Sequence, residues 1–274
     1  STRDIPLWNR VNMALIPGAD NLRINVDDGG REGLPVIFVH SLAGNASQWS
    51  MQLDHLRKER RAAAFDLRGH GLSDLPSDGD YWVETLAEDI GIVARSLDLE
   101  RFVLVGHSLG GSASIAYAGE NPHRVKGLLL VDPSGDGRML PNEIIEPFLA
   151  ALQSDDYLRT IRDYWQTLLV GSSQVVAERV MNDLYATPKD VVAGAFRDSL
   201  LFDPVTMLQR YPGPKLSVIS HLNSAPYSLH NLVSDLPIIK ISGTGHWLQM
   251  DRPEEFNRIM DDFLASLDKG EKSF

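Results

Sequence analysis

Short apolar runs alternate with segments of helical spacing along most of this 274-residue chain. Runs such as PVIFVH at 35–40 and RFVLVG at 101–106 have the composition of buried strands. Segments such as WVETLAEDIGIVARSLD at 82–98 place their apolar residues on one helical face. The alternation predicts the α/β class, with a mostly parallel, twisted sheet flanked by helices. The predicted strands are 35–40, 61–67, 101–106, 125–132, 214–220 and 236–242, and the predicted core helices are 47–59, 82–98, 109–122 and 253–267.

One long stretch interrupts this alternation. From residue 138 to residue 210 the spacing is helical and no convincing strand occurs. We interpret this stretch as a helical cap inserted into the sheet domain. The chain then divides into an α/β core (1–137 and 211–274) and a cap (138–210). Sites in such sheets lie at the carboxyl ends of the strands, so we expect the functional residues there.

Composition excludes several classes of function. The formal net charge is −11 and no basic cluster stands out, so no nucleic-acid partner is expected, because phosphate neutralisation needs Lys and Arg. The absence of cysteine rules out disulfides and thiolate chemistry. No apolar run approaches the roughly 20 residues of a transmembrane helix, so no membrane partner is expected. The first residues, STRDIP, lack a signal-peptide pattern, and we expect a cytoplasmic location. Nothing in the sequence specifies an oligomeric state.

The stretch GHSLG at 106–110 places Ser108 between two glycines, directly after an apolar run. It matches the G-x-S-x-G pattern of a nucleophilic serine at a strained turn between a strand and a helix. Gly106 and Gly110 relieve the crowding in such a turn. A glycine-rich turn with a bystander serine is the alternative. The predicted strand before the motif and the predicted helix after it favour the nucleophile.

A serine hydroxyl needs a base to react near neutral pH, and this base is usually histidine. His246 is the candidate, because it follows the last predicted strand and precedes the last helix, which brings it to the sheet edge of Ser108. Three other histidines are expected to be structural. His107 is the neighbour in the turn and points elsewhere, His40 ends a strand and organises its loop, and His70 lies in a glycine-rich turn.

Two backbone N–H groups are candidates for an oxyanion hole, which stabilises the negative charge formed by attack on a carbonyl. The N–H of Leu109 lies at the start of a predicted helix, where partial positive charge gathers. The N–H of Leu42 lies in the loop that leaves the strand predicted at 35–40.

Five stretches together resemble the α/β-hydrolase superfamily, in its small capped branch of esterases, lactonases and haloalkane-dehalogenase-like proteins. They are VIFVHSLAG, FDLRGHGLSD, VGHSLGG, GLLLVDP and GTGHWLQMDRPEEF, which occur in family order and with family spacing. The resemblance implies the α/β-hydrolase fold and a serine hydrolase without cofactor or metal. It implies a small-molecule ester or lactone as substrate, a Ser-His-Asp triad and an acyl-enzyme intermediate. Haloalkane dehalogenation itself is disfavoured, because that mechanism uses an aspartate where Ser108 stands.

Ser41 departs from the family pattern, because relatives usually carry His-Gly before the oxyanion residue. The loop HSLAGNASQW at 40–49 is closer to that of the 3-oxoadipate enol-lactonases. This similarity favours ester or lactone substrates.

The triad acid is a second departure. The family usually carries an aspartate in the loop after the penultimate strand, but residues 221–226 contain no carboxylate. Another family position for the acid, at the end of the strand that follows the nucleophile helix, is occupied here by Asp132. We therefore predict Asp132 as the acid. Asp136, or a weaker dyad assisted by Asn223 or Ser224, is the alternative.

The predicted substrate pocket is apolar and enclosed. We expect Ser41 and Trp165 to contribute to it, together with Trp247 and Leu248, which adjoin His246. Two further functions stay open for the same fold. One is a cofactor-free dioxygenase, which also retains a serine, a histidine and a carboxylate, and the other is a non-catalytic ligand receptor.

Overall fold

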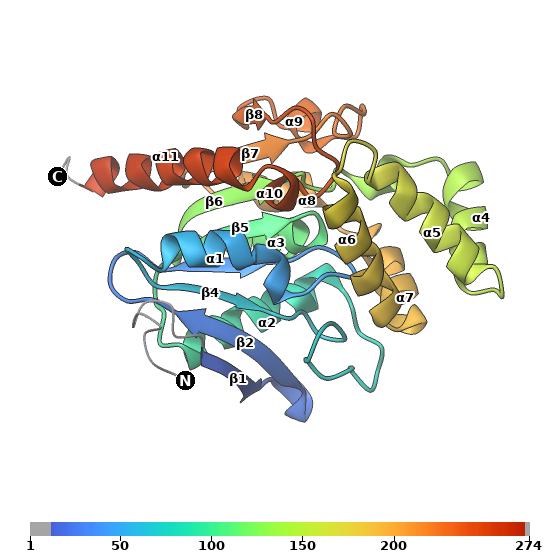
Figure 1. The fold of residues 1–274 in the computed structure, drawn as a ribbon, viewed down its shortest axis with the longest axis horizontal. Helices are drawn as coiled ribbons and strands as arrows, with labels where there is room; N and C mark the ends of the chain where they lie inside the picture. The colour runs from blue at the N-terminus through green and yellow to red at the C-terminus, as the bar shows by residue number, and fades with distance from the viewer. Residues whose placement is uncertain (1–11, 272–274) are drawn as a thin grey trace.

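Segments from both halves of the chain form one eight-stranded sheet in the computed structural model, which describes residues 12–271 (Figure 1). The strand order is β1-β2-β4-β3-β5-β6-β7-β8. The strands are β1 (Asn12–Pro17), β2 (Arg23–Gly29), β3 (Val36–Val39), β4 (Ala62–Phe65), β5 (Phe102–His107), β6 (Val125–Val131), β7 (Lys215–Ile219) and β8 (Ile238–Lys240). Neighbouring strands from β4 to β8 run parallel, and β1 and β2 pair antiparallel. The predicted α/β class with a mostly parallel sheet is confirmed.

All six predicted strands belong to this sheet. Their apolar runs explain the placement, because β3 and β5 are buried at every position. Central parallel strands covered on both faces need such continuous apolar sequence. β8 is the contrast: it lies at the edge of the sheet and all three of its residues are exposed.

The sequence predicts neither β1 nor β2, which extend the sheet at its other edge. β2 reads RINVDDG and carries charged side chains along its length. In β1, Met13 is 53% exposed and Leu15 is 47% exposed. Such mixed, short segments lack the uninterrupted apolar run that identifies a buried strand, because they are antiparallel and only partly covered.

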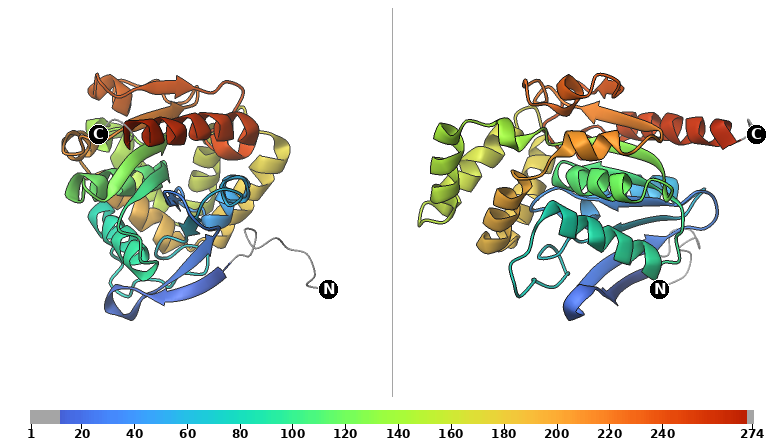
Figure 2. Two further views of the ribbon diagram at one scale, coloured as in Figure 1. Left: turned by 90° about the vertical axis from the view of Figure 1, so that its left-hand side faces the viewer. Right: turned by 180° about the vertical axis from the view of Figure 1, so that it is seen from behind.

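Helices cover both faces of the sheet (Figure 2). Two of them, α2 (Val83–Ser96) and α3 (Leu109–Glu120), pack on one face, and their apolar residues join one core cluster. On the other face, α1 (Ser50–Leu56) and α11 (Pro253–Glu271) contribute to a second cluster. The remaining short helices of the core are η2 (Ala19–Asn21), η3 (Ala46–Trp49), η4 (Gly137–Met139), α9 (Leu229–Leu232) and α10 (Leu248–Asp251).

The chain between β6 and β7 forms five α-helices, in the stretch where the sequence predicts a cap. They are α4 (Asn142–Leu152), α5 (Tyr157–Leu168), α6 (Gln174–Ala186), α7 (Lys189–Ser199) and α8 (Pro204–Gln209). Helices α4 to α7 lie beyond the carboxyl ends of the parallel strands (Figure 1). Apolar residues of these helices form a third cluster, which includes Trp247 of the core. The last helix, α8, packs through Leu208 into the cluster of α2 and α3.

The first residues, for which the sequence predicts no signal peptide, lie outside the described residues. Between residues 12 and 271, no helix has both the length and the apolar character needed to cross a membrane.

Candidate active site

Ser108 occupies the tight turn between β5 and α3. Its backbone has φ 52° and ψ −112°, a conformation that is sparsely populated for residues other than glycine. A Cβ atom at Gly106 would collide with the carbonyl oxygen of Gly110, and one at Gly110 would collide with the carbonyl oxygens of Val39 and His40. Both glycines are therefore required by close backbone contacts, and the turn directs the Ser108 side chain away from the sheet.

Asp132 and His246 form a hydrogen-bonded pair at the same edge of the sheet. His246 Nδ1 lies 2.7 Å from Asp132 Oδ2, and the two side chains are 13% and 1% exposed. The carboxylate also accepts hydrogen bonds from the backbone N–H and the hydroxyl of Ser220, at 2.9 and 2.7 Å, and from Asn223 Nδ2 at 3.2 Å. This dense set of donors stabilises a buried negative charge.

These contacts determine the protonation state of Asp132. Burial alone would raise the pKa of Asp132, but the hydrogen bonds from His246 and Ser220 and the attraction of the imidazole lower this pKa below its usual value. An ionised carboxylate only accepts hydrogen bonds, so Nδ1 of His246 carries a proton, and the neutral tautomer selected by this contact has its lone pair on Nε2. Nε2 is therefore free to accept a proton from another group.

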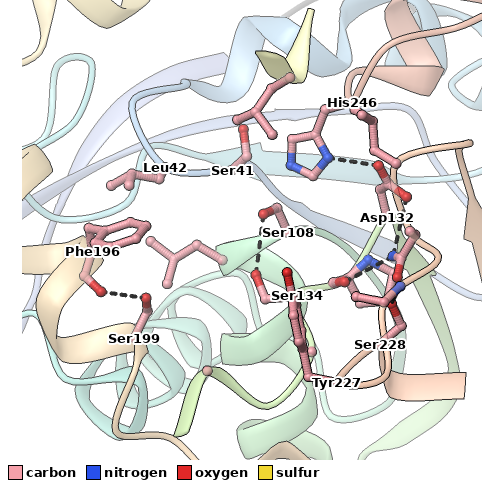
Figure 3. A pocket seen from close by; sticks show the side chains of 18 of the residues that line it. Ser41, Leu42, Ser108, Asp132, Ser134, Phe196, Ser199, Tyr227, Ser228 and His246 are labelled. Carbon is pink, nitrogen blue, oxygen red and sulfur yellow. Dashed lines mark hydrogen bonds and ion pairs between the residues drawn. The ribbon is translucent and has the colours of Figure 1, made fainter. Parts of the chain in front are cut away.

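Ser108, His246 and Asp132 line one cavity of about 320 Å³ (Figure 3). The cavity lies between the carboxyl ends of the strands and the helices α5 and α7. Several residues that the sequence singled out line this cavity as well: Ser41, Leu42, Leu109, Trp165 and Trp247.

The prediction that Leu248 faces the pocket is wrong. Leu248 is fully buried and packs in the core cluster that contains Trp49 and Phe256. It begins helix α10, and side chains of successive helical residues point about 100° apart. Trp247 precedes the helix and lines the cavity, while Leu248 enters the apolar core.

The alternative acids have other partners. Asp136 forms an ion pair with Arg138, whose Nη2 lies 2.8 Å from its Oδ2. Asn223 hydrogen-bonds Asp132 and does not replace it, and Ser224 is exposed on the loop.

His107 lies under the ring of His246, with the two ring centroids 4.7 Å apart. Its Nε2 is 2.7 Å from the carbonyl oxygen of His246, to which it donates because a carbonyl only accepts. Gln249 Nε2 approaches the other ring nitrogen at 3.3 Å. Burial, followed by the neighbouring His246, lowers the pKa of His107 to about 3. A neutral His107 thus holds the backbone of His246 in place.

His40 and His70 organise the loops under the site. His40 Nε2 accepts the N–H of Leu67 at 2.9 Å, and His70 Nε2 accepts the N–H of Ala43 at 3.0 Å. Burial lowers the pKa of His40 to about 4 and that of His70 to about 3. Both histidines are neutral acceptors of backbone hydrogen bonds, in agreement with the structural role expected of them.

A clamp that the sequence did not predict joins the α5–α6 loop to the loop of His246. The N–H of His246 donates to the carbonyl oxygen of Leu168 at 2.9 Å. The Asp251 carboxylate accepts the N–H of Gly245 at 3.1 Å and the Ser172 hydroxyl at 2.8 Å. Asp251 follows the predicted histidine by five residues, and a carboxylate so close to a candidate base was the available signal.

Three further polar residues at the site were missed. Ser134 Oγ lies 3.4 Å from Ser108 Oγ (Figure 3), and it follows Asp132 by two residues. Tyr164 of α5 and Tyr227 of the β7–α9 loop also line the cavity. No motif surrounds these tyrosines, so only the folded structure reveals them.

Comparison with known proteins agrees with the observed fold. The family described as alpha/beta hydrolase fold matches residues 35–253. The chain is 28% identical over 254 residues to the dihydrolipoyllysine-residue acetyltransferase component of the acetoin cleaving system of Pseudomonas putida, and covers 65% of that protein with 86% of its own length. It is 26% identical over 264 residues to an sn-1-specific diacylglycerol lipase of Mus musculus, with 89% of this chain and 85% of that protein covered.

Solved structures share the fold over nearly the whole chain. Est816, an N-acyl homoserine lactone degrading enzyme, matches with a TM-score of 0.73 and 24% identity over 90% of this chain and 98% of its own. The enol-lactonase of Burkholderia xenovorans LB400 matches with a TM-score of 0.79 and 19% identity over 93% and 100%. Identities this low show the fold alone. Since the family match covers most of the sequence and the observed sheet agrees with it, the chain belongs to the α/β-hydrolase fold family.

Proposed function

We propose that this protein is a serine hydrolase of carboxylic esters, lactones included, with Ser108 as nucleophile, His246 as base and Asp132 as the triad acid. The observation that supports this most strongly is the 2.7 Å contact between His246 and the buried Asp132 carboxylate, in a cavity that Ser108 also lines. A histidine fixed in this way by a carboxylate can activate a serine hydroxyl.

The mechanism follows from the protonation states. His246 Nε2 takes the hydroxyl proton while Ser108 Oγ attacks the carbonyl carbon of the ester. The N–H groups of Leu42 and Leu109 stabilise the oxyanion, and Asp132 stabilises the imidazolium. His246 then protonates the leaving alcohol, which leaves an acyl group on Ser108. Water, deprotonated by His246, attacks this acyl-enzyme and releases the carboxylic acid and the free serine.

We also propose that the helices between residues 138 and 210 act as a cap that encloses the reacting ester. Tyr164, Trp165 and Leu168 of α5 and Phe196 of α7 line the cavity opposite the strand ends. Enclosure by apolar side chains strengthens the electrostatic interactions on which this mechanism relies.

The names of related proteins support the same reaction class. The matched proteins include a diacylglycerol lipase, an N-acyl homoserine lactone degrading enzyme and an enol-lactonase. An esterase of Thermogutta terrifontis shares the fold as well.

Replacement of the nucleophile tests the proposal. Ser108→Ala should lower kcat for p-nitrophenyl acetate by roughly 10⁴- to 10⁶-fold, because no other hydroxyl occupies the turn. A fluorophosphonate should label the tryptic peptide 102–124, which contains Ser108, in the wild-type protein only. Label on peptide 127–138, which contains Ser134, or a Ser108→Ala variant with more than a tenth of the activity, would refute this assignment.

A further inference from the structure

The cavity wall carries almost no charge. Among the described residues that line it, none is Lys, Arg or Glu. Its acid, Asp132, is already paired with His246. A substrate carboxylate in this cavity would therefore lie beside a negative residue without a cation to compensate it.

Such an arrangement disfavours anionic substrates. Transfer of an ionised carboxylate from water to a largely apolar site is strongly unfavourable unless the charge is paired. Asp132 adds repulsion at short range, and the net charge of −11 opposes the approach of anions. The part of the substrate that enters the cavity is therefore uncharged.

Besides several serines and Asn223, two phenols line the cavity. The hydroxyl of Tyr227 points toward Ser108 and Ser134 (Figure 3). Tyr164 approaches from α5, and burial, with Tyr227 nearby, raises its pKa to about 12, so it is a hydrogen-bond donor at neutral pH. Neither hydroxyl has a partner among the described residues. Unpaired donors that line a ligand cavity are suited to bind an acceptor on the ligand.

We propose that the cavity selects short, uncharged acyl groups that carry a second carbonyl oxygen, as in an amide or a ketone, and rejects acyl groups that end in a carboxylate. Tyr164 and Tyr227 are the specificity-determining donors to that oxygen. The inference rests on the proposed ester hydrolysis, in which the acyl group stays bonded to Ser108 through deacylation. A cavity of about 320 Å³ is at the small end of ligand pockets, which agrees with a short chain.

Three ethyl esters of nearly equal shape test the selection. Ethyl succinamate ends in an amide, ethyl 4-methylpentanoate in an isopropyl group and monoethyl succinate in a carboxylate. Ethanol release at pH 7.5 gives kcat/KM for each ester. We expect kcat/KM for the amide ester to be about tenfold higher than for the hydrocarbon ester and at least about 100-fold higher than for the carboxylate ester. Differences of this size are typical when a hydrogen bond is lost or a charge is buried without a partner.

Phenylalanine variants test the role of the tyrosines. In Tyr164→Phe and Tyr227→Phe, the ratio of kcat/KM for the amide ester to that for the hydrocarbon ester should fall by roughly tenfold. Tyr185→Phe is the matched control, because Tyr185 is 52% exposed on α6 and does not line the cavity. This control should keep the wild-type ratio.

The outcomes separate the inference from the function on which it rests. Turnover of monoethyl succinate at a rate equal to or above that of the amide ester overturns the inference alone, and so do unchanged ratios in both phenylalanine variants. A protein that hydrolyses none of the three esters, nor p-nitrophenyl acetate, overturns the proposed function as well.

Discussion

Ser108 and Asp132 both have a positive φ angle, although they follow different strands. Their φ angles are 52° and 42°, in the left-handed region that residues other than glycine rarely adopt. Strain of this kind concentrates at functional sites, where the surrounding structure holds it. Here the turn at each strand end brings a side chain to the cavity that His246 also lines.

The charge of Asp132 gives the first prediction. Asp132→Asn should lower kcat for p-nitrophenyl acetate by roughly 10²- to 10⁴-fold, because an amide carries no charge and can fix the wrong tautomer of His246. Asp136→Asn is the control and should stay within about twofold of the wild type, since Asp136 is paired with Arg138. Steady-state kinetics, with circular dichroism to verify folding, checks both. Equal losses in the two variants would mean that His246 relies on another acid.

The sequence predicts the placement of the proposed catalytic residues at the strand ends better than it predicts the walls of the cavity. Ser108, His246 and Asp132 follow from where strands end, because the ends of parallel strands meet at one edge. Leu248 was misplaced, since the choice between it and Trp247 depends on the first turn of α10. Tyr164 and Tyr227 carry no local signal, and only tertiary packing brings them to the cavity.

At the scale of elements, the clamp connects the end of α5 and the α5–α6 loop to His246, the proposed base. The carbonyl oxygen of Leu168 accepts the N–H of His246, and Asp251 accepts hydrogen bonds from both loops. The close fit extends to Gly171, with φ 98°, where a Cβ would collide with the carbonyl oxygen of Thr244. The α5–α6 loop and the backbone of His246 are therefore linked by direct hydrogen bonds.

Weakening of the clamp should impair the reaction before it impairs folding. Asp251→Asn replaces one acceptor oxygen with an NH₂ group, which faces donors such as the N–H of Gly245. Because two donors repel each other, the loop should shift and displace His246. We expect the rate of fluorophosphonate labelling at Ser108 to fall by roughly ten- to 100-fold, the loss typical of small misplacements of a catalytic group. Asp268→Asn, an exposed change on α11, is the control and should label at the wild-type rate. Wild-type labelling of Asp251→Asn would show that the clamp does not position the base.

The elements themselves were predictable where burial is uniform. Central strands such as β3 and β5 are continuous apolar runs, and α2 buries the face of Val83, Leu86 and Ile90 that its spacing predicts. The edge strands β1 and β2 and the clamp were not predictable. Edge strands mix exposed and buried positions, and the clamp depends on hydrogen bonds between segments far apart in the sequence.

At the scale of the whole molecule, three histidines among the described residues are buried and neutral, His40, His70 and His107, and they make the stability of the fold depend on pH. In the unfolded chain they take up protons as the pH falls through about 6.5. In the folded protein the lowered pKa values, about 4 for His40 and about 3 for His70 and His107, prevent this uptake. Between the folded and the unfolded pKa values, the chain therefore takes up protons when it unfolds. The stabilisation that is present above pH 6.5 is lost as the pH falls toward 4.

This linkage predicts the acid behaviour of the protein. Below pH 6.5 the free energy of unfolding should fall by up to about 1.4 kcal/mol per pH unit for each histidine. For the three histidines together the slope is up to about 4 kcal/mol per pH unit. Guanidinium chloride titrations at pH 8.0, 7.0, 6.0 and 5.0 measure it. The free energies of unfolding at pH 8.0 and 7.0 should be nearly equal, whereas those at pH 6.0 and 5.0 should differ strongly from each other. A constant free energy of unfolding from pH 7.0 to 5.0 would contradict the buried neutral state of these histidines.

The path of the chain through its helical insertion limits how this protein can be recombined with its relatives. The helices between β6 and β7 are contiguous in sequence, so a chimera that exchanges them needs only two crossovers. However, residues 168–173 within that block form hydrogen bonds with the segment 244–251, near the other end of the chain. A transplanted block needs a compatible partner for this segment, and chimeras that inherit both segments from one parent are expected to retain more activity than those that inherit them from two.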